Sequence, residues 1–93
     1  MNYVIEQGDL VESLSGRDKG GIFLVVRVLD GNAEIVDGKI RKVLAIKKKN
    51  IKHLKLIKKA GNKSLVEKII GGEPVGNKTV RKSIADNQKK QEE

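Results

Sequence analysis

Runs of apolar residues separated by turn signals predict a series of short β-strands over the first sixty positions of the chain. The segment GDLVESL, residues 8–14, alternates in part and is followed by a break at Ser15 and Gly16. The run IFLVVRVL, residues 22–29, is rich in β-branched residues, as expected of a central strand buried on most of its surface. Three further segments are predicted to be strands: residues 32–37, 39–46 and 53–58.

Two Asp-Gly pairs divide these strands. Asp30-Gly31 and Asp37-Gly38 mark tight turns, because both residue types tolerate the positive φ that favoured hairpin turns require. Short strands with turns this close together predict a small antiparallel barrel or sandwich of about five strands.

The chain changes character at about residue 61, where two short helices are predicted. The first has apolar positions between 65 and 70, a cap at Asn62 or Ser64, and an end at Gly71-Gly72. The second has a cap at Asn77 or Thr79 and an apolar pair, Val80 and Ile84, one turn apart, for which we favour packing on the barrel over docking a partner. We therefore expect a barrel over residues 1–59 and a helical extension with a frayed tail over 60–93.

Length and composition narrow the class of protein. A chain of 93 residues forms one small domain, and aromatic residues make up only 2%, so the core is built mainly from Ile, Leu and Val. The chain contains no Cys, which excludes disulfides and thiolate metal ligands. The start lacks the pattern of a signal peptide and no apolar run is long enough to span a membrane, so we expect a cytoplasmic protein with no membrane partner. We also expect the free protein to be a monomer.

Charge is segregated along the chain, and the positions of the charges are more informative about binding partners than the net charge of +8. Residues 1–40 contain four basic and seven acidic side chains, whereas residues 41–60 contain nine basic and none acidic. Solubility alone does not require such segregation. A patch of one sign beside an ordered body is the electrostatic pattern of a protein that binds a polyanion.

The basic block RKVLAIKKKNIKHLKLIKK, residues 41–59, has two structural interpretations. As an amphipathic helix it would suit a membrane surface or a calmodulin-like partner. We prefer two strands, because Asn50 and the β-branched residues interrupt the helical pattern. On this interpretation KKKNIK, residues 47–52, connects the strands, and Leu54 and Leu56 anchor the second one to the barrel while Lys55 faces outward.

The stretch GDLVESLSGRDKGGIFLVV, residues 8–26, resembles the KOW motif. In that motif a Gly-Asp pair opens a strand, a basic Gly-containing loop follows, and a hydrophobic strand returns. The matching pieces are Gly8-Asp9, Val11, the loop 16–20 and the strand from Ile22 to Val28. Further on, VDGKIRKV, residues 36–43, and NIKHL, residues 50–54, extend the resemblance to the KOW-type large-subunit ribosomal proteins of archaea and eukaryotes and to their short bacterial relatives.

The resemblance covers roughly residues 3–58 and implies an SH3-like β-barrel that binds RNA, commonly in a ribosomal setting. Many KOW proteins have a further Gly where this chain has Phe23. The large-subunit relatives also lack that Gly, so the departure narrows the family without breaking the match.

Two segments carry the expected RNA contacts, the loop Gly16–Gly21 and the basic block Arg41–Lys59. Glycines in the loop allow unusual backbone angles and the close approach of another backbone, and its two basic side chains are placed to reach phosphates. Asp18 is expected to orient the basic side chains on either side of it. The candidate RNA-binding residues are Arg17, Lys19, Gly20, Arg41, Lys42, Lys47, Lys48, Lys49, Lys52, His53 and Lys55.

Other kinds of chemistry find little support in the sequence. Gly16 and Gly21 have the spacing of a nucleotide-binding loop, but Ile22-Phe23 stands where that loop needs Lys and Ser or Thr. One His, no Cys and scattered acids predict no catalytic pair, metal site or cofactor. We expect a non-enzymatic protein that binds structured RNA, above all ribosomal RNA. Ribosomal proteins are the expected protein partners. The alternative is a barrel that docks an acidic protein in the transcription or translation machinery.

Overall fold

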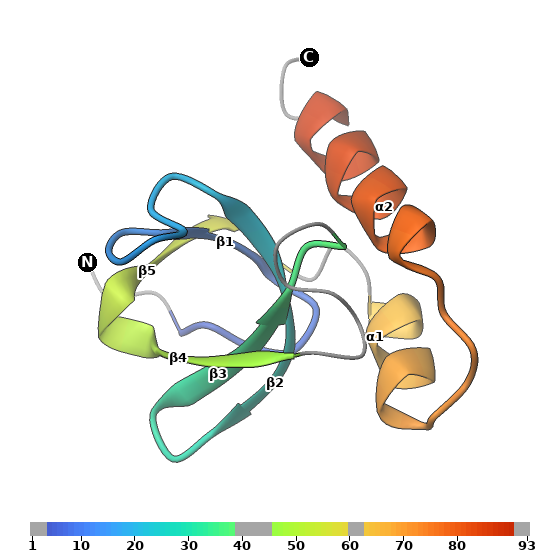
Figure 1. Ribbon diagram of the computed structural model, residues 1–93, viewed down its shortest axis with the longest axis horizontal. Helices are drawn as coiled ribbons and strands as arrows, with labels where there is room; N and C mark the ends of the chain where they lie inside the picture. The colour runs from blue at the N-terminus through green and yellow to red at the C-terminus, as the bar shows by residue number, and fades with distance from the viewer. Residues whose placement is uncertain (1–3, 39–45, 60–62, 91–93) are drawn as a thin grey trace.

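The computed structural model describes residues 4–38, 46–59 and 63–90, and shows five strands and two helices in this part of the chain (Figure 1). The strands are β1 (Leu10–Ser13), β2 (Ile22–Leu29), β3 (Asn32–Val36), β4 (Lys47–Asn50) and β5 (Leu54–Lys58). A 3₁₀ turn, Ile51–His53, joins β4 to β5, and the helices are α1 (Lys63–Ile70) and α2 (Asn77–Lys90).

The five strands form one antiparallel sheet in the order β4-β3-β2-β1-β5. The sheet curves, so that its two edge strands, β4 and β5, are linked by the short 3₁₀ turn (Figure 1). Within the described residues these edges share no ladder, and the barrel is therefore open. The predicted fold class, a small mainly β protein with a helical C-terminal extension, is confirmed.

The β2–β3 hairpin has the turn that its sequence predicts. Asp30 and Gly31 are its two central residues, with φ of 53° and 77°, and Leu29 pairs with Asn32 across the turn. Two consecutive positive φ values define the type I′ turn, whose twist matches that of the flanking strands.

The sheet is apolar on both faces. Phe23 and Val25 point into the barrel, where they pack with Val11, Ile35 and Leu54. The neighbouring positions of β2 point to the opposite face and form a second cluster with residues of α1 and α2. That cluster consists of Leu10, Leu24, Val26, Val36, Val66, Val80 and Ile84.

The helices thus complete the core. Val66 and Val80 are fully buried and Ile84 is nearly so, which confirms that the apolar pair of the second helix packs on the barrel. The helices cover one side of the sheet and leave the β1–β2 loop uncovered on another (Figure 1). The loop on that uncovered side carries Arg17 and Lys19.

The prediction that KKKNIK, residues 47–52, connects two strands is wrong for its first four residues, whereas Ile51 and Lys52 do lie in the 3₁₀ turn between β4 and β5. Residues 47–50 are themselves the edge strand β4, paired with β3, whereas the predicted strand 39–46 lies, apart from Ile46, outside the described residues. Lys47 and Lys49 pair with the buried Ile35 and Ala33 and so share their face, while Lys48 is on the other face. The backbone of this lysine-rich strand pairs with β3. Long lysine stems can in general cover apolar surface while their charged ends stay in water.

Candidate nucleic-acid interface

The loop between β1 and β2 is a compact turn held by its own backbone. Gly20 donates to the Ser13 carbonyl at 2.8 Å, and Gly21 donates to the Asp18 carbonyl at 2.9 Å. Gly16 and Gly20 have φ of 80° and 87°, which favours glycine. A side chain at Gly20 would meet nothing within 4 Å, so the loop presents open backbone at this position.

Asp18 points inward from this loop. Its Oδ1 accepts hydrogen bonds from Ser13 Oγ at 2.9 Å and from Lys49 Nζ at 2.8 Å. The Asp18 side chain is 1% exposed and that of Lys49 only 9%. Lys49 also donates to the Ser15 carbonyl at 2.6 Å, so this one lysine of β4 ties down two residues of the loop.

The electrostatics of Asp18 follow from these contacts. Burial alone would raise the pKa of Asp18, but hydrogen bonds from Lys49 and Ser13, together with the charge of Lys49, outweigh burial and lower it. The carboxylate is therefore ionised at neutral pH, and its negative charge faces the lysine instead of the solvent. The sequence predicts that Asp18 orients Arg17 and Lys19, the basic residues on either side of it. In the structure its carboxylate instead accepts hydrogen bonds from Ser13 and Lys49.

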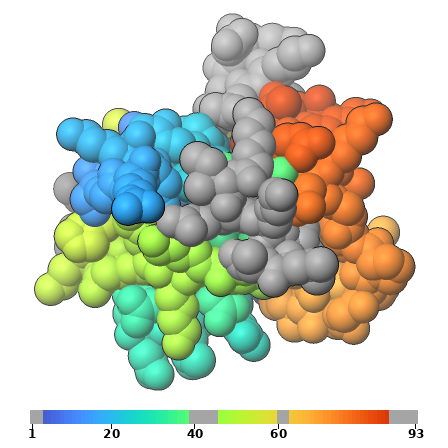
Figure 2. All heavy atoms as spheres, viewed as in Figure 1, coloured from blue at the N-terminus to red at the C-terminus, as the bar shows by residue number. Residues whose placement is uncertain are grey.

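Exposed basic side chains flank both members of this pair in the sequence. Arg17 and Lys19 are exposed on the loop, and Lys48 is exposed on β4. The 3₁₀ turn lies beside the loop, because Leu14 donates its amide hydrogen to the His53 carbonyl at 2.8 Å. Figure 2 shows the loop and the segment from β4 to β5 side by side on one face of the molecule.

The structure brings together most of the candidate residues. Lys52, His53 and Lys55 are exposed on the 3₁₀ turn and β5, and Lys47 is partly exposed. Leu54 and Leu56 pack in the barrel as predicted, and Lys55 faces outward. Arg41 and Lys42 lie outside the described residues. Lys49 also belongs to this segment, but its side chain is only 9% exposed. Its position in a run of lysines does not predict this burial.

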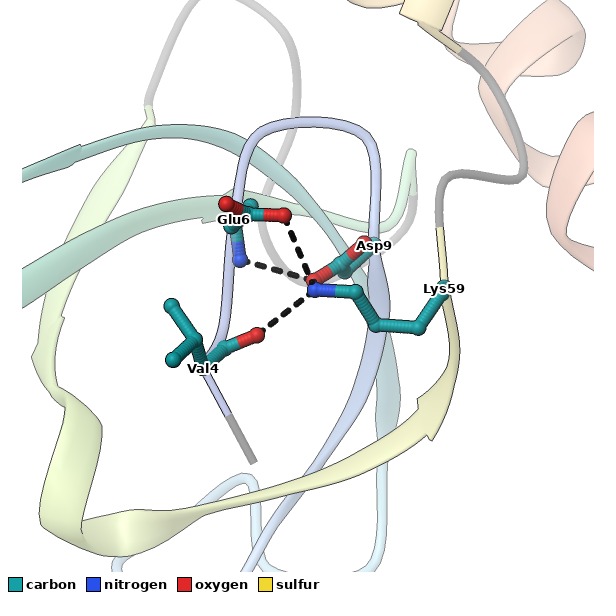
Figure 3. Close-up of polar contacts among 4 residues, drawn as sticks. All are labelled: Val4, Glu6, Asp9 and Lys59. Atoms are coloured by element: carbon teal, nitrogen blue, oxygen red, sulfur yellow. Dashed lines mark hydrogen bonds and ion pairs between the residues drawn. The ribbon is translucent and has the colours of Figure 1, made fainter. Parts of the chain in front are cut away.

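A second lysine of the basic block is also held by a buried aspartate (Figure 3). Lys59 Nζ lies 2.8 Å from Asp9 Oδ2, 3.1 Å from Glu6 Oε1 and 2.6 Å from the Val4 carbonyl oxygen. The same Asp9 oxygen accepts the Glu6 amide at 2.7 Å. The hydrogen bond to Asp9 raises the pKa of Lys59 against the opposing effect of desolvation, and Glu6 adds to the rise.

Little in the sequence predicts these two pairs. Turn chemistry is enough to explain an Asp at position 9, and Asp18 is a loop residue between two basic neighbours. The signal that could find the pairs is charge segregation itself, since the acidic residues of the first forty positions are the natural partners of basic ones further on. Only the strand order shows which lysines meet which carboxylates.

The described residues 4–38, 46–59 and 63–90 contain no group of three or more His, Cys, Asp or Glu side chains that could hold a metal ion. None of the helices described is long and apolar enough to cross a membrane. In comparisons with known proteins, no family model matches the chain and no curated protein matches it. What the site can bind is therefore inferred from the chemistry of its own residues.

Proposed function

We propose that this protein binds structured RNA through phosphate contacts made by the β1–β2 loop and by exposed lysines of the segment Lys47–Lys55. The main support for the proposal is that these two segments lie side by side on one face of the molecule. They meet at the contact between Lys49 and Asp18, which are 31 residues apart in the sequence. Together, residues 15–20 and 47–55 hold seven Lys or Arg and a single acid, Asp18, whose carboxylate faces Lys49. In the sheet, Lys48 lies opposite Glu34 and Lys55 opposite Glu12. Basic side chains still outnumber these three carboxylates, and we propose that the excess positive charge meets an external anion.

The chemistry of the exposed residues suits phosphates. Arg17 has a planar fork of donors that can hold one phosphate with two hydrogen bonds, whereas Lys48 and Lys52 act as mobile point charges. The open space at Gly20 lets a sugar–phosphate backbone approach the loop closely. Each phosphate that is neutralised releases condensed counterions, so the affinity falls steeply with salt.

The shortage of aromatic rings favours structured RNA over unpaired strands. Phe23 is fully buried in the barrel, and Tyr3, the other aromatic residue, lies outside the described residues. Stacking on unpaired bases needs exposed rings. Recognition in this protein then depends on phosphates, 2′-hydroxyls and helical shape.

The resemblance to KOW-type ribosomal proteins gives the proposed setting. On that resemblance the RNA is ribosomal, the protein acts with ribosomal proteins in translation, and it works in the cytoplasm without catalysing a reaction. The resemblance rests on Gly8-Asp9, the loop 16–20 and the strand that follows it.

The test compares two charge-reversal variants that change the net charge equally. The site variant is Lys48→Glu/Lys52→Glu/Lys55→Glu, and the control is Lys68→Glu/Lys78→Glu/Lys82→Glu, whose lysines are exposed on α1 and α2. Affinity for a folded ribosomal RNA fragment is measured over a series of salt concentrations. We expect the site variant to weaken binding strongly and to reduce the salt slope by about one unit for each phosphate that is no longer neutralised.

Equal effects of the two variants would contradict the proposal, because only net charge would then matter. The alternative function is docking of an acidic protein by the barrel. In that case co-sedimentation of the native protein with ribosomes survives complete ribonuclease digestion, whereas RNA binding predicts its loss. Lys49 is left unchanged in both variants, because its replacement would also disturb the loop.

A further inference from the structure

Lys49 differs from the lysine that precedes it in β4. Lys48 is exposed, whereas the Lys49 side chain is 9% exposed and its ammonium is turned toward the β1–β2 loop. Both acceptors that hold the ammonium, the Ser15 carbonyl and the Asp18 carboxylate, belong to that loop. A lysine from one edge of the sheet thus fixes a loop that lies more than thirty residues earlier in the sequence.

This contact bears directly on the two basic side chains of the loop. Asp18 lies between Arg17 and Lys19, and its side chain points inward while theirs are exposed. The backbone of the loop closes on Asp18, because its carbonyl accepts the Gly21 amide at 2.9 Å. Holding the Asp18 side chain therefore holds the turn that presents Arg17 and Lys19 to solvent.

We infer that Lys49 is a positioning residue of the proposed RNA site and not a phosphate contact. It holds Asp18, and through Asp18 the loop conformation in which Arg17 and Lys19 are exposed together. The identity of the ligand in this inference rests on the proposed function, but the effect of Lys49 on the loop does not.

Hydrogen-bonding capacity supports this division of roles. An ammonium has three donors, and at Lys49 two of them are directed at Ser15 and Asp18 inside the protein. To reach a phosphate, the Lys49 side chain would have to leave a carboxylate that is 1% exposed. Separating a buried ion pair in this way is strongly unfavourable, since it leaves a buried charge uncompensated.

Lys59 provides a control with the same chemistry, although its side chain is 45% exposed, against 9% for Lys49. Its ammonium also lies 2.8 Å from a carboxylate that is 1% exposed, that of Asp9, but this pair holds the N-terminal turn (Figure 3). Lys59 follows β5, at the end of that strand remote from the 3₁₀ turn. Breaking either pair affects the stability of the fold, but only the Lys49 pair holds the loop.

The experiment uses the full chain with Lys49→Met, Lys49→Arg, the double variant Lys49→Met/Asp18→Asn, and Lys59→Met. The double variant removes both charges, so that no uncompensated carboxylate prevents folding. Hydrogen exchange at the amides of Lys19, Gly20 and Gly21 is measured without RNA. Affinity for the folded ribosomal RNA fragment and its salt slope are then measured for the same proteins.

We expect Lys49→Met and the double variant to speed exchange at the three loop amides and to weaken RNA binding about tenfold, the size expected when two long side chains must be ordered on binding. Their salt slope stays that of the wild type, because the same phosphates are neutralised. Lys49→Arg restores slow exchange and affinity, and Lys59→Met leaves both unchanged.

Two results would overturn the inference. Loop exchange that is unaffected in both Lys49→Met and the double variant would show that Lys49 does not hold the loop. A salt slope reduced by about one unit, as for removal of an exposed lysine, would make Lys49 a phosphate contact. If the wild type binds no RNA, the proposed function fails, while the exchange data still decide whether Lys49 positions the loop.

Discussion

Lys59 and Asp9 join the end of β5 to the turn that precedes β1, with 2.8 Å between Nζ and Oδ2 (Figure 3). Lys49 and Asp18 make the same kind of contact at the other side of the barrel. The two aspartates come from the acidic first forty residues and the two lysines from the basic block. The block therefore folds without the full cost of like-charge repulsion, because part of its charge is matched inside the protein.

Replacement of Asp9 by Ala is expected to destabilise the fold. The Glu6 amide, which donates to Asp9 at 2.7 Å, would lose its acceptor, and the Lys59 ammonium would lose its buried partner. A hydrogen-bonding group left without its partner costs roughly 1–3 kcal/mol, and we expect the free energy of unfolding to fall by an amount in this range. Urea unfolding at neutral pH measures it.

Glu6 provides the matched control for Asp9. Its carboxylate also accepts from Lys59, at 3.1 Å, but its side chain is 64% exposed. Glu6→Gln should change the free energy of unfolding by no more than about 0.5 kcal/mol, as exposed substitutions usually do. Equal effects of the two substitutions would mean that burial of Asp9 contributes nothing to the strength of the contact.

Gly38 is expected to accept no side chain. It has φ of 76°, and an added Cβ would collide with the Asn77 carbonyl oxygen and lie 2.9 Å from Arg81 Cγ, at the start of α2. Gly38→Ala should therefore cost roughly 2–4 kcal/mol, combining left-handed strain with overpacking. Gly31 has φ of 77° and nothing within 4 Å of an added Cβ. Gly31→Ala therefore introduces the left-handed backbone strain without a steric clash. Thermal unfolding of Gly38→Ala and Gly31→Ala then isolates the clash, and equal destabilisation of the two variants would contradict it.

Acid should weaken the contact between the loop and β4. The pKa of Asp18 is lowered in the folded protein, because the hydrogen bonds from Lys49 and Ser13 and the Lys49 charge outweigh desolvation. A carboxylate with a lowered pKa contributes stability that is present above its unfolded pKa, about 3.9, and is lost as pH falls through the folded value. The stability difference between wild type and Asp18→Asn should thus be constant from pH 7 to about pH 5 and shrink below about pH 4. A difference that grows toward low pH, in urea unfolding, would contradict this sign.

Local sequence signals predict most of the fold. The hairpin at Asp30-Gly31, the buried run of β2 and the apolar pair Val80 and Ile84 all depend on nearest neighbours or on a helical period, and all are as expected. The fourth strand does not follow this logic. KKKN has poor β-propensity, and it is a strand because β3 offers a backbone edge and because a buried partner takes the inward-facing Lys49 side chain.

The candidate site is predictable as a surface but not residue by residue. Composition identifies the loop and the basic block, and the fold places them side by side. Sequence alone assigns Lys48 and Lys49 the same role, yet one is exposed and the other is held by Asp18. That difference depends on a contact between residues 31 positions apart, which no local pattern contains.

The proposed function predicts a preference for folded RNA over unpaired strands. Phe23 is fully buried, so in the described part of the chain no phenylalanine or tyrosine ring is presented to an unpaired base. We expect an RNA hairpin to compete more strongly than an oligouridine of equal length at the same salt concentration, because the hairpin holds its phosphates at the fixed spacing of an A-form helix. Competition against a labelled ribosomal RNA fragment measures this preference, with a DNA hairpin of the same sequence as the control for 2′-hydroxyl contacts. Tighter binding of the unpaired strand, with an affinity that falls when its bases are removed, would mean that the protein reads stacked bases and that the phosphate-based assignment of the face is wrong.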